Sequence, residues 1–123
     1  MLAWLTWGFI LFVLTLLAGF WLLKTGKPYR TGIFNLHKLI ALGASGLYLY
    51  TLYTLSRSEG ASIPACTLFN LGGFLVIVLL GSGAMLSIGK PDHKAVLIGH
   101  RIGAGLALLA VLFILYLQFT NAI

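Results

Sequence analysis

Charged residues are scarce in this chain. Of its 123 residues only 8% are Asp, Glu, Lys or Arg, whereas 60% are hydrophobic. A soluble domain has about 25% charged residues, so this chain has too few to cover a surface that faces water. Lipid must therefore surround much of it, and the short stretches between its apolar runs leave no room for a second, soluble domain.

Cysteine is nearly absent. Cys66 is the single cysteine, which excludes an internal disulfide and a metal site built on paired cysteines. A charged leader and a small-residue cleavage site are also missing, because apolar residues follow Met1 directly. We therefore expect the first apolar segment to be a permanent helix and not a signal peptide that is removed.

Long apolar runs are what the chain has instead, at residues 2–23, 33–55, 64–88 and 95–120. Each is near or above the ~20 residues needed to cross a hydrocarbon core of ~30 Å. Irregular backbone cannot face lipid, so each run is expected to be helical, and the short loops make neighbouring helices antiparallel. The sequence thus predicts an all-α membrane protein, a four-transmembrane-helix up-down bundle in a single domain over residues 1–123.

Basic residues gather on one side of these spans. Arg57 alone lies at the other end, and the remaining seven of the eight basic residues lie at the end shared by the first and third loops: Lys24, Lys27, Arg30, Lys38, Lys90, Lys94 and Arg101. The positive-inside rule then places loops 24–32 and 89–94 in the cytoplasm and both termini outside. We interpret the net charge of +6 as a topology signal and not as a nucleic-acid surface. The expected location is the plasma membrane of a bacterium or archaeon.

Two parts of the chain match at an offset of 63 residues. Gly26-Lys27-Pro28 matches Gly89-Lys90-Pro91, and a histidine, His37 or His100, stands nine residues beyond each proline. Each copy contains two spans, so both enter the membrane in the same direction, and such a parallel repeat implies a pseudo-two-fold axis along the membrane normal. We expect the two histidines at equal depth, ~8 Å along their helices from the cytoplasmic ends, and facing each other.

A histidine inside a span is costly and therefore a functional candidate. A zinc ion normally takes four ligands, and no acid, thiol or third histidine lies at this depth. A haem brings four nitrogens of its own and needs two axial ligands. Helices on the diagonal of a bundle lie ~13 Å apart, which leaves room for a porphyrin. The hypothesis is one haem b with His37 and His100 as axial iron ligands, non-covalent because no Cys-x-x-Cys-His motif is present.

Small and basic residues accompany the two histidines. Four alanines follow them on the same helix faces, four and seven residues later: Ala41, Ala44, Ala104 and Ala107. Gly103 is expected to widen the space beside His100, while Lys38 and Arg101, with Lys27 and Lys90, could pair with the haem propionates. The alternatives are that small residues allow close helix packing and that basic side chains reach up to lipid headgroups.

The histidine pair, with one member in each even-numbered span, resembles the axial pair of four-helix transmembrane b-type cytochromes. Many of these cytochromes hold two haems on two histidine pairs, whereas this chain has one pair, at its cytoplasmic end. The resemblance implies a reduced, single-haem version. Its expected role is one-electron transfer near the cytoplasmic face, with a quinone in the lipid bilayer or a cytoplasmic redox protein as partner.

Two other classes stay open. A small transporter would need a polar pathway, and the candidates near the midplane are Thr15, Ser45 and Ser82, whose hydroxyls usually bond their own helix. A structural or assembly subunit could pack the glycine-rich third span, with Gly72 and Gly73, on a partner or on another copy of the chain. No nucleophile with a base and no metal-water site is recognisable, so no catalytic residue is assigned and any enzymatic activity would be haem redox chemistry.

Overall fold

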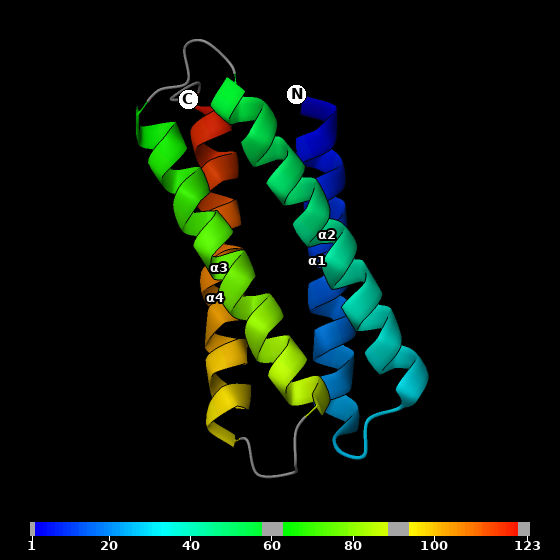
Figure 1. The fold of residues 1–123 in the computed structure, drawn as a ribbon. Helices are drawn as coiled ribbons and strands as arrows, with labels where there is room; N and C mark the ends of the chain where they lie inside the picture. The colour runs from blue at the N-terminus through cyan, green and yellow to red at the C-terminus, as the bar shows by residue number, and fades with distance from the viewer. Residues whose placement is uncertain (1, 58–62, 89–93, 121–123) are drawn as a thin grey trace. The chain divides into compact units, whose positions relative to one another are not determined.

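The computed structural model describes residues 2–57, 63–88 and 94–120, and almost all of them are α-helical (Figure 1). The helices are α1 (Leu2–Thr25), α2 (Thr31–Arg57), α3 (Ile63–Ile88) and α4 (Lys94–Phe119). Each helix end lies within two residues of the end of a predicted apolar run. The prediction of an all-α fold is confirmed.

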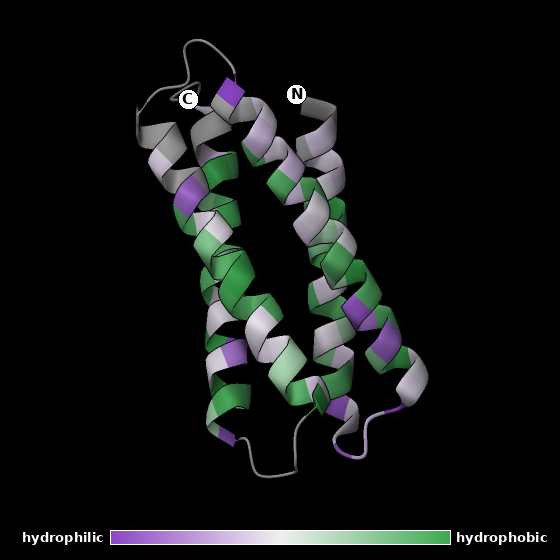
Figure 2. Ribbon diagram, viewed as in Figure 1, coloured by the Kyte–Doolittle hydropathy of each residue, from purple (hydrophilic) through white to green (hydrophobic). Residues whose placement is uncertain are grey.

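Three of the four helices are long and apolar enough to cross a membrane. The qualifying stretches are Thr6–Thr25 in α1, Asn70–Ile88 in α3 and Lys94–Tyr116 in α4. Helix α2 has 27 residues, but its first turns contain Asn35, His37 and Lys38. Figure 2 shows the resulting hydrophilic bands near the beginning of α2. The fourth crossing therefore does not follow from hydropathy alone.

Large apolar side chains cover the outer surfaces of the helices. Leu39, Phe20, Phe74, Ile77 and Leu109 are each more than 60% exposed. Exposing so much apolar area to water is costly, at roughly 25 cal/mol for each Å², whereas lipid tails accept it without this cost. The buried apolar residues are fewer, and they are Ala18, Leu22, Ala107 and Ile114. This distribution fits helices that lipid surrounds.

The chain divides into two compact units, Met1–Thr51 and Leu52–Ile123. The first unit contains α1 and most of α2, which form an antiparallel hairpin (Figure 1). Gly26 follows the last residue of helix α1; its φ of 68° is left-handed, and its N–H donates to the Leu22 carbonyl at 3.1 Å. Glycine takes this conformation without a steric penalty, which is why it commonly closes helices. The chain can therefore turn back into α2 after a short loop.

The second unit contains the hairpin of α3 and α4, which pack against each other. Gly103 on α4 marks a close approach, because a Cβ atom added there would lie 3.2 Å from Leu79 Cδ2 on α3. Small residues at such crossings let helix backbones come together in a membrane, where van der Waals packing drives association. The same hairpin brings His100 of α4 beside α3.

Candidate functional site

His37 lies half-buried on α2 and turns toward α1. Its Nδ1 atom lies 3.0 Å from the carbonyl oxygen of Thr15. A carbonyl oxygen only accepts hydrogen bonds, so Nδ1 of His37 carries the proton and donates it. In the neutral ring the lone pair is then on Nε2, which is the atom a metal or a haem iron would bind.

Gly19 on α1 makes this approach possible. A Cβ atom at position 19 would lie 3.1 Å from Cε1 and 3.5 Å from Nδ1 of His37. The imidazole therefore occupies space that a larger residue would fill. The carbonyl of Thr15 is one helical turn earlier, so the missing side chain also leaves that oxygen open to His37.

His100 lies half-buried on α4 and is held by a side chain of α3. Its Nδ1 atom lies 2.8 Å from Oγ of Ser82, and the same Oγ lies 3.1 Å from the carbonyl oxygen of Leu79. The serine hydroxyl has one hydrogen to donate. When it donates to the Leu79 carbonyl, Oγ accepts from Nδ1–H of His100. In that arrangement both histidines have the same tautomer, with the lone pair on Nε2.

Within each hairpin, the histidine contacts the neighbouring helix at positions that match at the repeat offset. Ser82 stands 63 residues after Gly19, as His100 stands 63 residues after His37. The first hairpin offers a backbone carbonyl to the imidazole, and the second offers a hydroxyl. The sequence shows that positions 19 and 82 are both small, but it did not reveal that they face the histidines. The signal that could have done so is their pairing at the repeat offset.

The three hydroxyls that are candidates for a transport pathway bond their own helices, which confirms the expectation for such groups. Thr15 Oγ1 donates to the Leu11 carbonyl at 2.8 Å, and Ser45 Oγ donates to the Ala41 carbonyl at 2.7 Å. Ser82 Oγ also bonds its own helix, at Leu79. Its additional contact with His100 was missed. Each of these three hydroxyls thus has an acceptor on its own helix.

The small residues predicted to leave room for the haem lie on the helices that carry the histidines. Ala41 and Ala44 on α2 are half-buried, as is Ala104 on α4, and Ala107 is buried. Their spacing places them on the same helix face as His37 or His100. Gly103 instead lies against Leu79, so in the α3–α4 hairpin it serves helix packing. A role for these residues around a cofactor stays a prediction.

The predicted propionate partners are arranged differently from one another. The ammonium of Lys38 lies 4.5 Å from the centre of the Phe34 ring, a cation–π contact, and Phe34 stacks on Tyr29 with ring centres 5.8 Å apart. Arg101 is exposed on α4, and Lys27 is exposed in the loop between α1 and α2. Lys90 lies outside the described residues. The aromatic pair thus gives Lys38 a defined place near the cytoplasmic end predicted for this hairpin.

The other candidate ligands of the chain are not among the side chains that the structure describes. Glu59, Asp92 and His93 lie outside the described residues, as does the side chain of Cys66. Among residues 2–57, 63–88 and 94–120, no three His, Cys, Asp or Glu side chains gather in a way that could hold a metal ion. A site with three or more protein ligands is therefore not found in these ranges.

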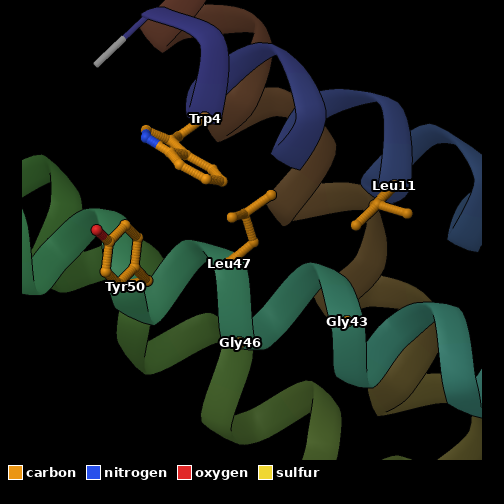
Figure 3. Close-up of a pocket in the computed structure, with 6 residues that line it drawn as sticks. All are labelled: Trp4, Leu11, Gly43, Gly46, Leu47 and Tyr50. Carbon is orange, nitrogen blue, oxygen red and sulfur yellow. The ribbon is translucent and has the colours of Figure 1, made fainter.

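An open apolar groove of about 460 Å³ lies elsewhere in the first hairpin (Figure 3). It is lined by Trp4, Leu11, Gly43, Gly46, Leu47 and Tyr50. The Trp4 and Tyr50 rings meet edge to face, with centres 5.7 Å apart. The groove has no histidine, acid or thiol in its lining, so it offers no ligand for a metal and no group for acid–base chemistry.

Comparison of the chain with protein-family models, with curated proteins and with solved structures finds no match. The candidate site rests on the chemistry and spacing of its own residues. These are two histidines, each held at Nδ1 by the neighbouring helix of its own hairpin.

The two glycines nearest the histidines provide a matched test of this packing. A Cβ atom at Gly83 would lie 3.4 Å from His100 Cε1, an ordinary contact, whereas the corresponding distance at Gly19 is 3.1 Å. Gly19→Ala is expected to displace His37 and lower the free energy of unfolding by about 1 kcal/mol, the typical worth of one hydrogen bond. Gly83→Ala is expected to be neutral. Thermal unfolding midpoints in detergent measure both, and equal losses in the two variants would contradict the close packing at Gly19.

Proposed function

We propose that the chain is an integral membrane protein that crosses the bilayer four times and holds one haem b, with His37 and His100 as the axial ligands of the iron. The observation that carries the proposal is the matching placement of the two histidines. They stand 63 residues apart, and Nδ1 of each lies within hydrogen-bond distance of a group on the adjacent helix of its hairpin. In the Nδ1–H tautomer, Nε2 of each ring has the lone pair that iron requires.

The number of candidate ligands favours haem over a bare metal ion. Structural zinc is almost always bound by four protein ligands, and the described residues gather no group of three. Haem needs two, because the porphyrin supplies the other four. When bound, it would take up and release one electron at the iron.

A fourth crossing through α2 is supported by its length and its surface. At 1.5 Å per residue its 27 residues extend about 40 Å, which exceeds the ~30 Å hydrocarbon core. Leu36, Leu39, Leu42 and Leu49 of α2 are each about half exposed or more. A helix lying on the membrane surface would present part of this apolar area to water. Together with the distribution of basic residues, this favours both termini outside and the loop at residues 24–32 in the cytoplasm.

The remaining residues have supporting roles in the proposal. Small side chains on the histidine-bearing helix faces leave room for a porphyrin in this proposal. They are Ala41, Ala44, Ala104 and Ala107, with Gly103 beside them. Lys38 and Arg101 are the cations nearest in sequence to the ligands and would pair with the propionates at the interface. The electron partner is a quinone in the lipid or a cytoplasmic redox protein, since the site lies near that face.

Visible spectra of the detergent-purified protein test the proposal. The protein is prepared from haem-replete cells, with and without added haemin, and is recorded oxidised and dithionite-reduced. The expected result is a sharp Soret band, split α and β bands on reduction, and one haem per chain by pyridine haemochrome assay. A protein that stays colourless after haemin is added would reject haem binding and turn attention to transport or to a packing subunit.

A further inference from the structure

We propose that Ser82 is a positioning residue: it fixes His100 in the Nδ1–H tautomer and thereby sets the reduction potential of the haem. The second part rests on the proposed function, whereas the first concerns the protein without cofactor. The argument depends on three atoms, Oγ of Ser82, Nδ1 of His100 and the carbonyl oxygen of Leu79, which form a chain of two hydrogen bonds.

The proposed direction of these bonds satisfies both acceptors with the hydrogens present. The Ser82 hydroxyl donates its one hydrogen to the Leu79 carbonyl, which can only accept. Oγ then accepts from Nδ1–H of the imidazole. A hydroxyl that already donates is polarised and becomes a better acceptor. Ser82 thus holds the proton on Nδ1 and the lone pair on Nε2.

The effect on an iron ligand follows from the same bond. A histidine that donates its second ring N–H to an acceptor is fixed in orientation and is a more basic ligand. A more basic ligand stabilises ferric iron more than ferrous iron, because the ferric form has the greater positive charge. Loss of the acceptor should therefore weaken ferric binding more than ferrous binding and raise the reduction potential.

In the first hairpin, the position that corresponds to Ser82 is Gly19, which has no side chain. His37 donates to the Thr15 carbonyl beside it. A backbone carbonyl cannot be removed by substitution. The acceptor for His100 is a side chain, so one substitution can remove the hydrogen-bond partner of His100 but not that of His37. This asymmetry makes Ser82 the residue where the potential can be tuned.

The experiment compares Ser82→Ala, Ser82→Thr and Ser45→Ala with the unaltered full-length protein. Ser45 is the matched control, because it lies in a helix, is half-buried and donates to a carbonyl of its own helix at 2.7 Å. Two readouts are used. One is the haem midpoint potential by redox titration, and the other is the histidine tautomer in the haem-free protein by ¹⁵N NMR.

Ser82→Ala is expected to raise the proportion of the Nε2–H tautomer at His100. It is also expected to weaken ferric binding roughly tenfold more than ferrous binding, at the lower end of the 10–100-fold effects of such outer partners. For one electron a tenfold ratio corresponds to a potential about 59 mV higher. Ser82→Thr should restore both values, because threonine keeps the hydroxyl, and Ser45→Ala should change neither.

Unchanged tautomer and potential in Ser82→Ala would overturn the inference, and so would an equal change in Ser45→Ala. A changed potential with an unchanged tautomer would overturn the mechanism through Nδ1. If the unaltered protein binds no haem, the proposed function fails, and with it the effect on potential. The NMR comparison on the haem-free protein still decides whether Ser82 fixes the tautomer of His100.

Discussion

Replacing either His37 or His100 by alanine is expected to abolish the low-spin haem spectrum, whereas replacing His93 leaves it intact. An axial imidazole contributes one of two protein bonds to the iron. Losing an outer partner of a ligand already costs ~10–100-fold in metal affinity, so losing the ligand should cost more. Soret absorbance per chain, measured after haemin titration, gives the result. His93 is the matched control because it is the third histidine of the chain and no role is assigned to it.

Added imidazole separates the loss of a ligand from a folding defect. Each alanine variant keeps its fold in this interpretation, so free imidazole should enter the vacated position and restore part of the low-spin spectrum. The two variants should behave alike, since the histidines are proposed to act on one iron. Loss in only one of them would contradict the paired ligation, and loss in His93→Ala would show that the spectrum does not report on the proposed site.

The helices were predictable from the sequence because particular residue types end a membrane helix. The segment from Lys24 to Gly32 contains such glycine, proline and basic residues. Helix α1 ends and α2 begins within two residues of the predicted limits. The number of crossings was less determined. Helix α2 includes Asn35, His37 and Lys38, and the same polarity that marks it as functional lowers its hydropathy below that of the other three helices.

The candidate site was predictable in its ligands but not in their orientation. His37 and His100 stand out because histidine is rare inside apolar runs. What each imidazole contacts depends on the register between two helices of a hairpin, and periodicity within one helix does not determine it. The sequence therefore could not show that His37 contacts a backbone carbonyl, that of Thr15, whereas His100 contacts a side-chain hydroxyl, that of Ser82.

Gly103 illustrates a related ambiguity. A small residue beside a histidine can leave room for a cofactor or let another helix approach. The structure shows Leu79 against Gly103, which supports helix packing, and a role for Gly103 beside a cofactor stays a prediction. The contacts of His37 with Gly19 and of His100 with Ser82 agree with the offset of 63 residues, and the repeat itself stays a prediction. The second Gly-Lys-Pro segment, Gly89 to Pro91, lies outside the described residues, so its match with Gly26 to Pro28 stays a prediction.

The two ends of α2 are expected to lie on opposite sides of the membrane and therefore to differ strongly in chemical labelling. Thr31 begins α2 and Arg57 ends it, and both are exposed. In a background where Cys66 is replaced by serine, Arg57→Cys should react with a membrane-impermeant maleimide in intact cells. Thr31→Cys should react only after the membrane is permeabilised. Thr120→Cys, near the C-terminus, should behave as Arg57→Cys does, because an even number of crossings returns the chain to the side where it began.

Equal labelling of Thr31→Cys and Arg57→Cys in intact cells would mean that α2 does not cross. The chain would then have three crossings, matching the three helices that qualify by length and hydropathy. His37 would leave the hydrocarbon layer, while His100 on α4 would remain within it, so the two could not lie at one depth. Opposite labelling would instead mean that α2 crosses the bilayer with His37 near its cytoplasmic end, which is what the proposed haem requires. The topology of α2 therefore decides whether the two hairpins can share a cofactor.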